Sequence, residues 1–166
     1  MILIFLKRFG WACLLVLLQA LILNNVHFSG YATPFLYIYL VLKFNADISR
    51  YTLLLWGFCL GLAVDIFSNT PGINAATTTL LAMSRPSLLQ LFVPRDSASN
   101  ISPGFKSMGA APFMRYATVC TFLHQTVFML LLTFSFEHPI ELLARILSSV
   151  LMTLLCIWSI EAVTRK

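Results

Sequence analysis

The sequence predicts an all-α integral membrane protein with a single polytopic domain over residues 1–166. Hydrophobic residues make up 59% of the 166 residues and charged residues only 10%, whereas soluble domains carry about 25% charged residues. The mean hydropathy is +0.87. A chain this apolar cannot cover itself with polar surface, so we expect most of it to lie in a lipid bilayer.

Apolar segments alternate with short polar turns along the chain, and six of them are expected to cross the membrane as helices. The second segment is short for a span, which needs about 20 residues, so we expect it to be tilted or extended by its flanks. Asp47 is expected to cap the third helix at its N-terminus. The expected spans are 9–23, 31–44, 48–67, 73–91, 113–136 and 140–163, and a longer cytoplasmic loop covers 92–112.

Basic residues orient these spans, because cytoplasmic loops are enriched in Lys and Arg. With both termini in the cytoplasm, Arg145 is the one basic residue of the eleven that falls toward the outside. The tryptophans agree, since Trp11, Trp56 and Trp158 then lie near inner helix ends, where an aromatic belt forms. The inner basic residues are Lys7, Arg8, Lys43, Arg50, Arg85, Arg95, Lys106, Arg115, Arg165 and Lys166.

Motifs of enzymatic chemistry are missing from the sequence. It contains no His-Glu-x-x-His, no Gly-x-Ser-x-Gly, no paired intramembrane aspartates and no phosphate-binding glycine loop. We therefore expect no enzyme, no catalytic residue and no cofactor. The basic residues form no run or stripe, so we expect no nucleic-acid partner. No metal site is expected, because four separated cysteines in apolar segments are typical packing residues; they are Cys13, Cys59, Cys120 and Cys156.

The most informative stretch connects the third and fourth spans. Gly57, Gly61 and Asp65 are spaced i, i+4 and i+8, which places them on one helix face. Glycines there allow another backbone to approach closely, and an acid in an apolar segment needs a partner or water. We expect Asp65 to hold the tight outer turn Ser68–Gly72 by accepting N–H bonds at the start of the next helix, with contact to a partner protein as the alternative.

Two further groups of polar residues lie within or beside apolar segments. Glu141 precedes Arg145 by four residues, the favourable order for a helical ion pair. We expect this outer-side pair, with Asp65 as the other candidate partner of Arg145. His124 and Gln125 lie near the middle of the fifth span, and we expect His124 to be a packed, hydrogen-bonded core residue.

The motif Gly57-x3-Gly61-x3-Asp65, followed by Pro71-Gly72-Ile-Asn74-Ala75 at the start of the next helix, resembles the bacterial rod shape-determining protein MreD family. The chain length, the six spans, the inside termini and the loop after the fourth span fit that family. The short second span and the abundance of phenylalanine suggest a divergent member. The resemblance implies a compact six-helix bundle similar to the S component of energy-coupling vitamin transporters.

The resemblance also implies a function. Members of the family are non-enzymatic scaffolds of the elongation machinery in the bacterial inner (cytoplasmic) membrane, which maintain rod shape and direct peptidoglycan synthesis. They bind MreC directly and share an assembly with RodA, a class B penicillin-binding protein and MreB. Our hypothesis is that Gly57, Gly61 and Asp65 shape a groove for MreC from within, while Gly72 and Asn74 hold the turn.

The alternative function is that of a substrate-binding S component of a small-molecule (vitamin) uptake transporter. That function predicts a ligand cavity lined by polar groups, and an Ala-x3-Ala face on the first helix for the coupling subunit. The first helix instead carries Gly10, Ala12, Cys13 and Ala20, which is a different pattern.

Overall fold

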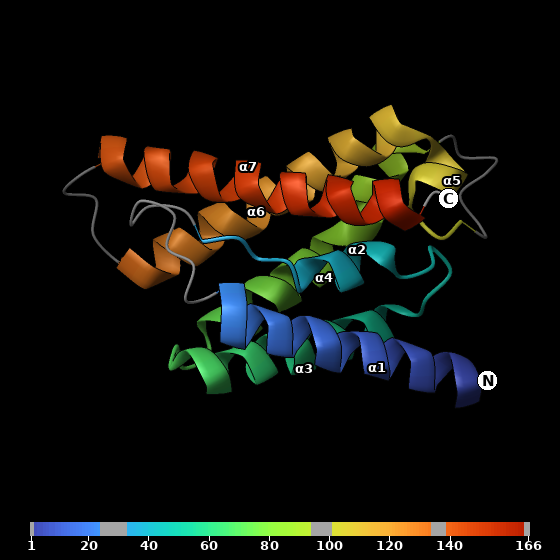
Figure 1. Ribbon diagram of the computed structural model, residues 1–166, viewed down its shortest axis with the longest axis horizontal. Coiled ribbons are helices and arrows are strands. Elements are labelled where there is room, and N and C mark those ends of the chain that lie inside the picture. Colours follow the sequence, from blue (N-terminus) through green and yellow to red (C-terminus); the bar gives the residue numbers. More distant parts are fainter. Residues whose placement is uncertain (1, 24–32, 94–100, 134–138, 165–166) are drawn as a thin grey trace.

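The computed structural model describes residues 2–23, 33–93, 101–133 and 139–164, and the only regular secondary structure in this part of the chain is helical, with no β-sheet (Figure 1). The helices are α1 (Ile2–Leu18), the π-helical turn η1 (Gln19–Leu23), α2 (Ile38–Lys43), α3 (Arg50–Ser68), α4 (Ile73–Phe92), α5 (Phe105–Met108), α6 (Ala110–Thr133) and α7 (Pro139–Thr164).

Three of the described helices are long and apolar enough to cross a membrane, namely α3, α6 and α7. A shorter apolar stretch, Phe9–Leu21, runs through α1 into η1. Large apolar side chains such as Leu55, Ile66 and Leu151 are exposed on the outside of the bundle. Together these features indicate a multi-pass membrane protein, because lipid-facing surfaces are apolar while water-facing surfaces are not.

The helix α4 runs diagonally through the middle of the bundle, between α3 on one side and α6 on the other, and α7 packs on α6 (Figure 1). The helix α1 lies beside α3. The start of α1 and the end of α7 lie at the same end of the molecule, together with α5, and we call this the terminal end. The turn between α3 and α4 lies at the opposite end.

The central helix α4 agrees with the expected span 73–91 in its bounds but is too polar to qualify as a membrane-crossing helix by itself. Its neighbours explain this composition, because they bury Asn74, Thr77, Thr78 and Arg85. A helix enclosed by protein does not have to be apolar, provided that its polar groups find partners. Several of its hydroxyl groups also donate back to the carbonyl oxygens of the preceding turn.

The predicted helix over 31–44 is wrong in its described part, because only Ile38–Lys43 is helical. Six residues span about 9 Å, far less than a bilayer. Residues 33–35 are in no helix. Side chains of η1 and α7 pair with the backbone at 33–36, which replaces the hydrogen bonds that a helix would make. These bonds are Thr33 N to Ser149 Oγ (3.1 Å), Phe35 N to Thr153 Oγ1 (3.0 Å), Leu36 N to Gln19 Oε1 (2.9 Å) and Gln19 Nε2 to Pro34 O (2.9 Å).

Three other boundaries differ from prediction. The cap of α3 is Ser49, whose Oγ accepts from Thr52 N at 3.2 Å, so the assignment of Asp47 as the cap is wrong. The expected loop 92–112 contains the short helix α5, and α6 begins at Ala110. The first helix begins before Phe9, since the charged pair ahead of the apolar segment is also helical. The predicted end of the fifth span, at 136, lies outside the described residues.

Candidate functional site

The corner between α3 and α4 is built around the buried carboxylate of Asp65. Its Oδ2 accepts from Ala75 N at 2.8 Å, and its Oδ1 accepts from Asn74 N and Asn74 Nδ2 at 3.0 Å and from Thr70 Oγ1 at 2.9 Å. The first N–H groups of a helix lack partners within it and carry partial positive charge. Asp65 therefore caps the N-terminus of α4 from the preceding helix. The hydrogen bonds that it accepts offset the cost of burying its charge.

Gly57 and Gly61 face α4 on the same side of α3 as Asp65. A Cβ atom at Gly61 would lie 2.6 Å from Ala75 Cα, and one at Gly57 would lie 2.9 Å from Ala82 Cβ. Real Cβ atoms do not approach other heavy atoms so closely. The two glycines thus bring the backbones of α3 and α4 into direct contact, as small residues do between membrane helices.

The turn itself uses left-handed backbone conformations. Asn69 ends α3 with φ of 54°, and Gly72 precedes α4 with φ of 81°. A Cβ at Gly72 would meet no atom within 4 Å, so the turn favours glycine there through its backbone conformation alone. The residues of this stretch therefore act together. Gly57, Gly61 and Asp65 determine how closely α3 and α4 approach, and Gly72 allows the chain to turn between them.

A chain of polar contacts leads from this corner into the centre of the bundle. Tyr37 Oη lies 3.1 Å from Asn74 Oδ1, 3.0 Å from Thr78 Oγ1 and 3.0 Å from His124 Nε2. Since Asn74 also donates to Asp65, one connected network joins α3, α4, the entry to α2, and α6. His124 is buried, and its ring stacks on Phe128, which matches the packed core residue expected from the sequence.

Polar atoms on one face of α6 remain without hydrogen-bonding partners among the described residues. They are Thr121 Oγ1, His124 Nδ1 and both amide atoms of Gln125. The spacing of three and four residues places these side chains on the same helical face, and Thr121 and Gln125 are fully buried. Unpaired polar atoms in the interior are costly, by about 1–3 kcal/mol each.

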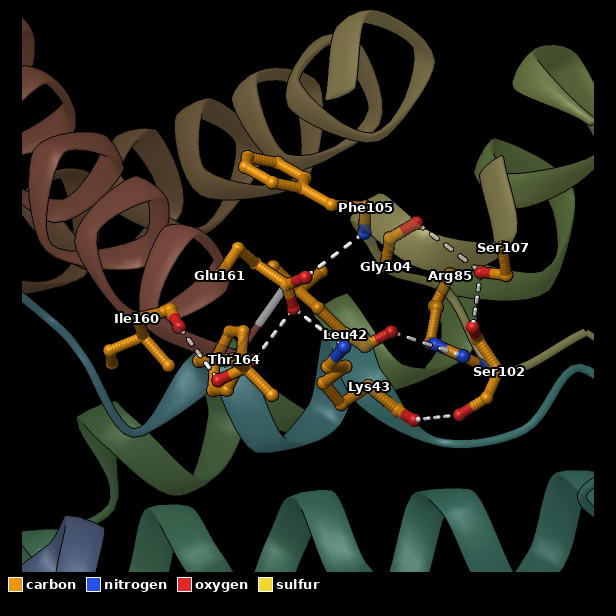
Figure 2. A network of polar contacts seen from close by, with 11 residues as sticks. Leu42, Lys43, Arg85, Ser102, Gly104, Phe105, Ser107, Ile160, Glu161 and Thr164 are labelled. Atoms are coloured by element: carbon orange, nitrogen blue, oxygen red, sulfur yellow. Dashed lines mark hydrogen bonds and ion pairs between the residues drawn. The ribbon is translucent and has the colours of Figure 1, made fainter. Parts of the chain in front are cut away.

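A second cluster, which the sequence analysis did not identify, lies at the terminal end around Glu161 of α7 (Figure 2). Glu161 Oε1 is 2.6 Å from Lys43 Nζ and accepts from Tyr39 Oη at 2.7 Å, while Oε2 accepts from Phe105 N at 2.9 Å. Glu161 is buried, and these three donors compensate its charge. The cluster fastens α7 to α2 and to the start of α5.

Arg85 of α4 lies next to this cluster and is also buried (Figure 2). Its Nη2 donates to the carbonyl oxygens of Phe44 and of Leu42, the latter at 3.3 Å. The last carbonyls of a helix lack partners within it, and a cation is favourable there. Arg85 thus caps the C-terminus of α2. This role explains why a basic residue is buried in the interior of the bundle at its terminal end rather than exposed on the surface.

The residues after the undescribed stretch 94–100 are tied to the same place. Ala46 N donates to Ile101 O at 2.9 Å, and Ser102 Oγ donates to Lys43 O at 3.3 Å. Ser107 Oγ in turn donates to Ser102 O at 2.6 Å. Residues 101–107 therefore pack against the end of α2.

The remaining predicted pair lies on the outer part of α7. Arg145 Nη2 is 2.9 Å from Glu141 Oε1, and both side chains are substantially exposed. This is the i, i+4 arrangement, which contributes only a few tenths of a kcal/mol. The pair lies apart from the Asp65 corner, whose carboxylate is occupied by α4, so the structure does not bring Arg145 into one site with Asp65.

The surface of α3 opposite α4 lines an apolar groove of about 350 Å³ against α1. We call it the α1–α3 groove. Small residues from both helices lie in it, including Ala12, Cys13, Cys59 and Ala63. Both cysteines are exposed and reduced. The described residues contain no group of three metal-ligating side chains.

The chain matches no protein-family model, no curated protein and no solved structure. The described residues form a tightly packed corner at one end, a polar network through the centre, a charged cluster at the terminal end, and an apolar groove on the outside.

Proposed function

We propose that this protein is a non-enzymatic scaffold of the bacterial elongation machinery, which binds MreC, maintains rod shape and directs peptidoglycan synthesis. The observation that carries the proposal is the α3–α4 corner, because the residues of the MreD-like motif are the ones that build it. Asp65 directs its carboxylate to the start of α4. That geometry favours a structural role over catalysis. RodA, a class B penicillin-binding protein and MreB belong to the same proposed assembly.

In this proposal the protein crosses the inner membrane six times with both termini in the cytoplasm, in a bundle similar to a transporter S component. The common position of the start of α1 and the end of α7 supports this topology. Exposed basic residues at that end, among them Lys106 and Arg115, support the cytoplasmic assignment. The second crossing then consists of the non-helical residues 33–37 followed by α2.

The binding surface we propose for the single membrane helix of MreC is the α1–α3 groove. Gly57 and Gly61 draw one face of α3 onto α4, so the groove lies on the other face. Small side chains in the groove allow a partner helix to approach closely, which is how helices associate in lipid. The corner would thus set the angle of the groove without contacting MreC.

Co-expression of the tagged chain with MreC from the same bacterium tests this proposal. Ala63→Phe would fill the groove, and we expect MreC recovery to fall at least tenfold. Leu143→Phe is the matched control, since Leu143 is an exposed residue of α7 away from the groove, and recovery should not change. Equal recovery with both variants would contradict the groove, and unchanged folding and MreC recovery with Gly61→Leu would contradict the role of the corner.

The alternative, a small-molecule uptake component, is favoured by one specific observation. Thr121, His124 and Gln125 each have a buried polar atom without a partner among the described residues. The non-helical chain at 33–37 lies nearby, since Tyr37 contacts His124. Interrupted helices with polar groups at mid-membrane are typical of transporter binding sites. Mass spectrometry of the purified protein would distinguish the two functions, since a retained vitamin-like molecule supports only the alternative.

A further inference from the structure

Two neighbouring pockets at the terminal end share a wall formed by Lys43, Ser102 and Thr164. The first, of about 290 Å³, lies between α1, α2 and α7. The second, of about 350 Å³, lies beside α5. Because three residues line both, the two pockets lie side by side, and we call the pair the terminal recess.

The two halves of the terminal recess differ in chemistry. Trp11, Leu15, Leu40 and Ile160 make the first half largely apolar. It opens between helices that face lipid. Trp11 is 54% exposed, and exposed tryptophan is typical of the level at which lipid headgroups begin. This half therefore suits the part of an acyl chain that lies next to the headgroup.

The second half of the recess is cationic. Lys43 keeps 30% of its side chain exposed although it pairs with Glu161. Lys106 is exposed and forms no ion pair with any residue that the structure describes. The charge of Glu161 is already compensated by Lys43, Tyr39 and Phe105 N. One positive charge is therefore left for a ligand, and the hydroxyl of Ser107 lies beside it.

We propose that the terminal recess binds one anionic phospholipid of the bilayer. The phosphate would lie between Lys43 and Lys106, and one acyl chain would lie against Leu15 and Ile160, between α1 and α7. Basic pockets between membrane helices bind anionic headgroups in this way, and each nearby cation strengthens the interaction. The lipid would join α1 to α7 across α2, and the proposal does not depend on MreC.

Lipid titration of the purified full-length protein in uncharged detergent tests the headgroup. We expect native mass spectrometry to detect one retained phosphatidylglycerol and no specifically retained phosphatidylcholine. Lys106→Gln should weaken phosphatidylglycerol binding about fivefold, as expected for one cation near the headgroup. Arg115→Gln removes the same charge from an exposed position of α6 outside the recess and should leave binding unchanged. Lys43 is unsuitable for substitution, because its loss would leave Glu161 without its ion-pair partner.

The chain-binding half has its own pair of variants. Ile160→Trp would fill the apolar pocket and should reduce phosphatidylglycerol binding at least tenfold. Leu155→Trp adds the same side chain to an exposed position of the same helix and should bind lipid as the unmodified protein does. The unfolding temperature of each variant without lipid provides the control for folding.

Three results would overturn the proposal. Phosphatidylcholine could be retained as well as phosphatidylglycerol, which would remove the role of charge. Lys106→Gln and Arg115→Gln could weaken binding equally, which would place the lipid outside the recess. Glycerol 3-phosphate alone could raise the unfolding temperature as much as phosphatidylglycerol does, which would make the ligand a soluble phosphate rather than a lipid.

Discussion

Asp65 connects two helices because one carboxylate accepts four hydrogen bonds at the start of α4. Asp65→Ala would leave those donors unpaired in a buried corner. We expect it to lower the free energy of unfolding by about 1–3 kcal/mol, measured by denaturant titration in mixed micelles. Asp47→Ala is the control, because Asp47 is exposed and caps no helix. Equal stability of the two variants would show that the corner does not depend on the carboxylate.

Two glutamates of α7 should respond differently to the same substitution. Glu161→Gln removes a buried charge that holds Lys43, Tyr39 and Phe105 N, and we expect a loss of about 1–3 kcal/mol. Glu141→Gln breaks only the exposed pair with Arg145, and we expect a loss of at most about 0.5 kcal/mol. Denaturant titration measures both. A larger effect at Glu141 than at Glu161 would contradict this ranking.

Two buried glutamines offer a similar comparison. The amide of Gln19 pairs with Leu36 N and Pro34 O, so Gln19→Met should cost about 1–3 kcal/mol. The amide of Gln125 has no partner among the described residues. Gln125→Met keeps a similar shape without the unpaired atoms and should leave the unfolding free energy unchanged or raised. A clear loss at Gln125 would indicate that an internal ligand or water occupies its amide, and would favour the transporter alternative.

The sequence predicted the Asp65 cap but not the Glu161 cluster, and sequence distance explains the difference. Asp65 and Asn74 are nine residues apart across one turn, so helix geometry alone brings them together. Lys43 and Glu161 meet only because α2 and α7 pack at the same end of the bundle. The one signal in the sequence was an acid, Glu161, near the end of an apolar helix, and this signal did not identify Lys43 as its partner.

At the scale of elements, the contact of α3 with α4 depends on Gly61. We expect Gly61→Ala to lower the free energy of unfolding by about 1–3 kcal/mol, because the new methyl group would overlap the backbone of α4. Gly10→Ala is the matched control in α1, where a methyl group would meet no atom within 4 Å. It should be neutral or slightly stabilising, since alanine favours helix. Thermal unfolding of both variants measures the difference, and a neutral Gly61→Ala would contradict the close approach.

Helices that face lipid were predictable, and those in the interior were less so. The apolar segments that became α3, α6 and α7 carry their own signal in composition and length. The segment 31–44 is also apolar, yet only six of its described residues are helical. Its backbone pairs with Gln19, Ser149 and Thr153, and no local pattern reports such distant partners.

At the scale of the whole molecule, polar groups form a path through an apolar bundle. The path begins at Asp65, passes through Asn74 and Tyr37, and ends at His124. Separately, Arg85 and Glu161 hold the terminal end together. These contacts connect all the long helices except α1, which is joined through Gln19 at the start of η1. The bundle therefore has a specified internal arrangement, as the proposed scaffold function requires.

The measurement that tests the central claim most directly is crosslinking of the tagged protein in its native membrane, followed by affinity purification and mass spectrometry. The scaffold proposal predicts recovery of MreC together with RodA and the penicillin-binding protein, with MreC crosslinked to the α1–α3 groove near Cys13 or Cys59. Recovery of an ATPase-linked membrane subunit without MreC would contradict the scaffold and support the uptake function.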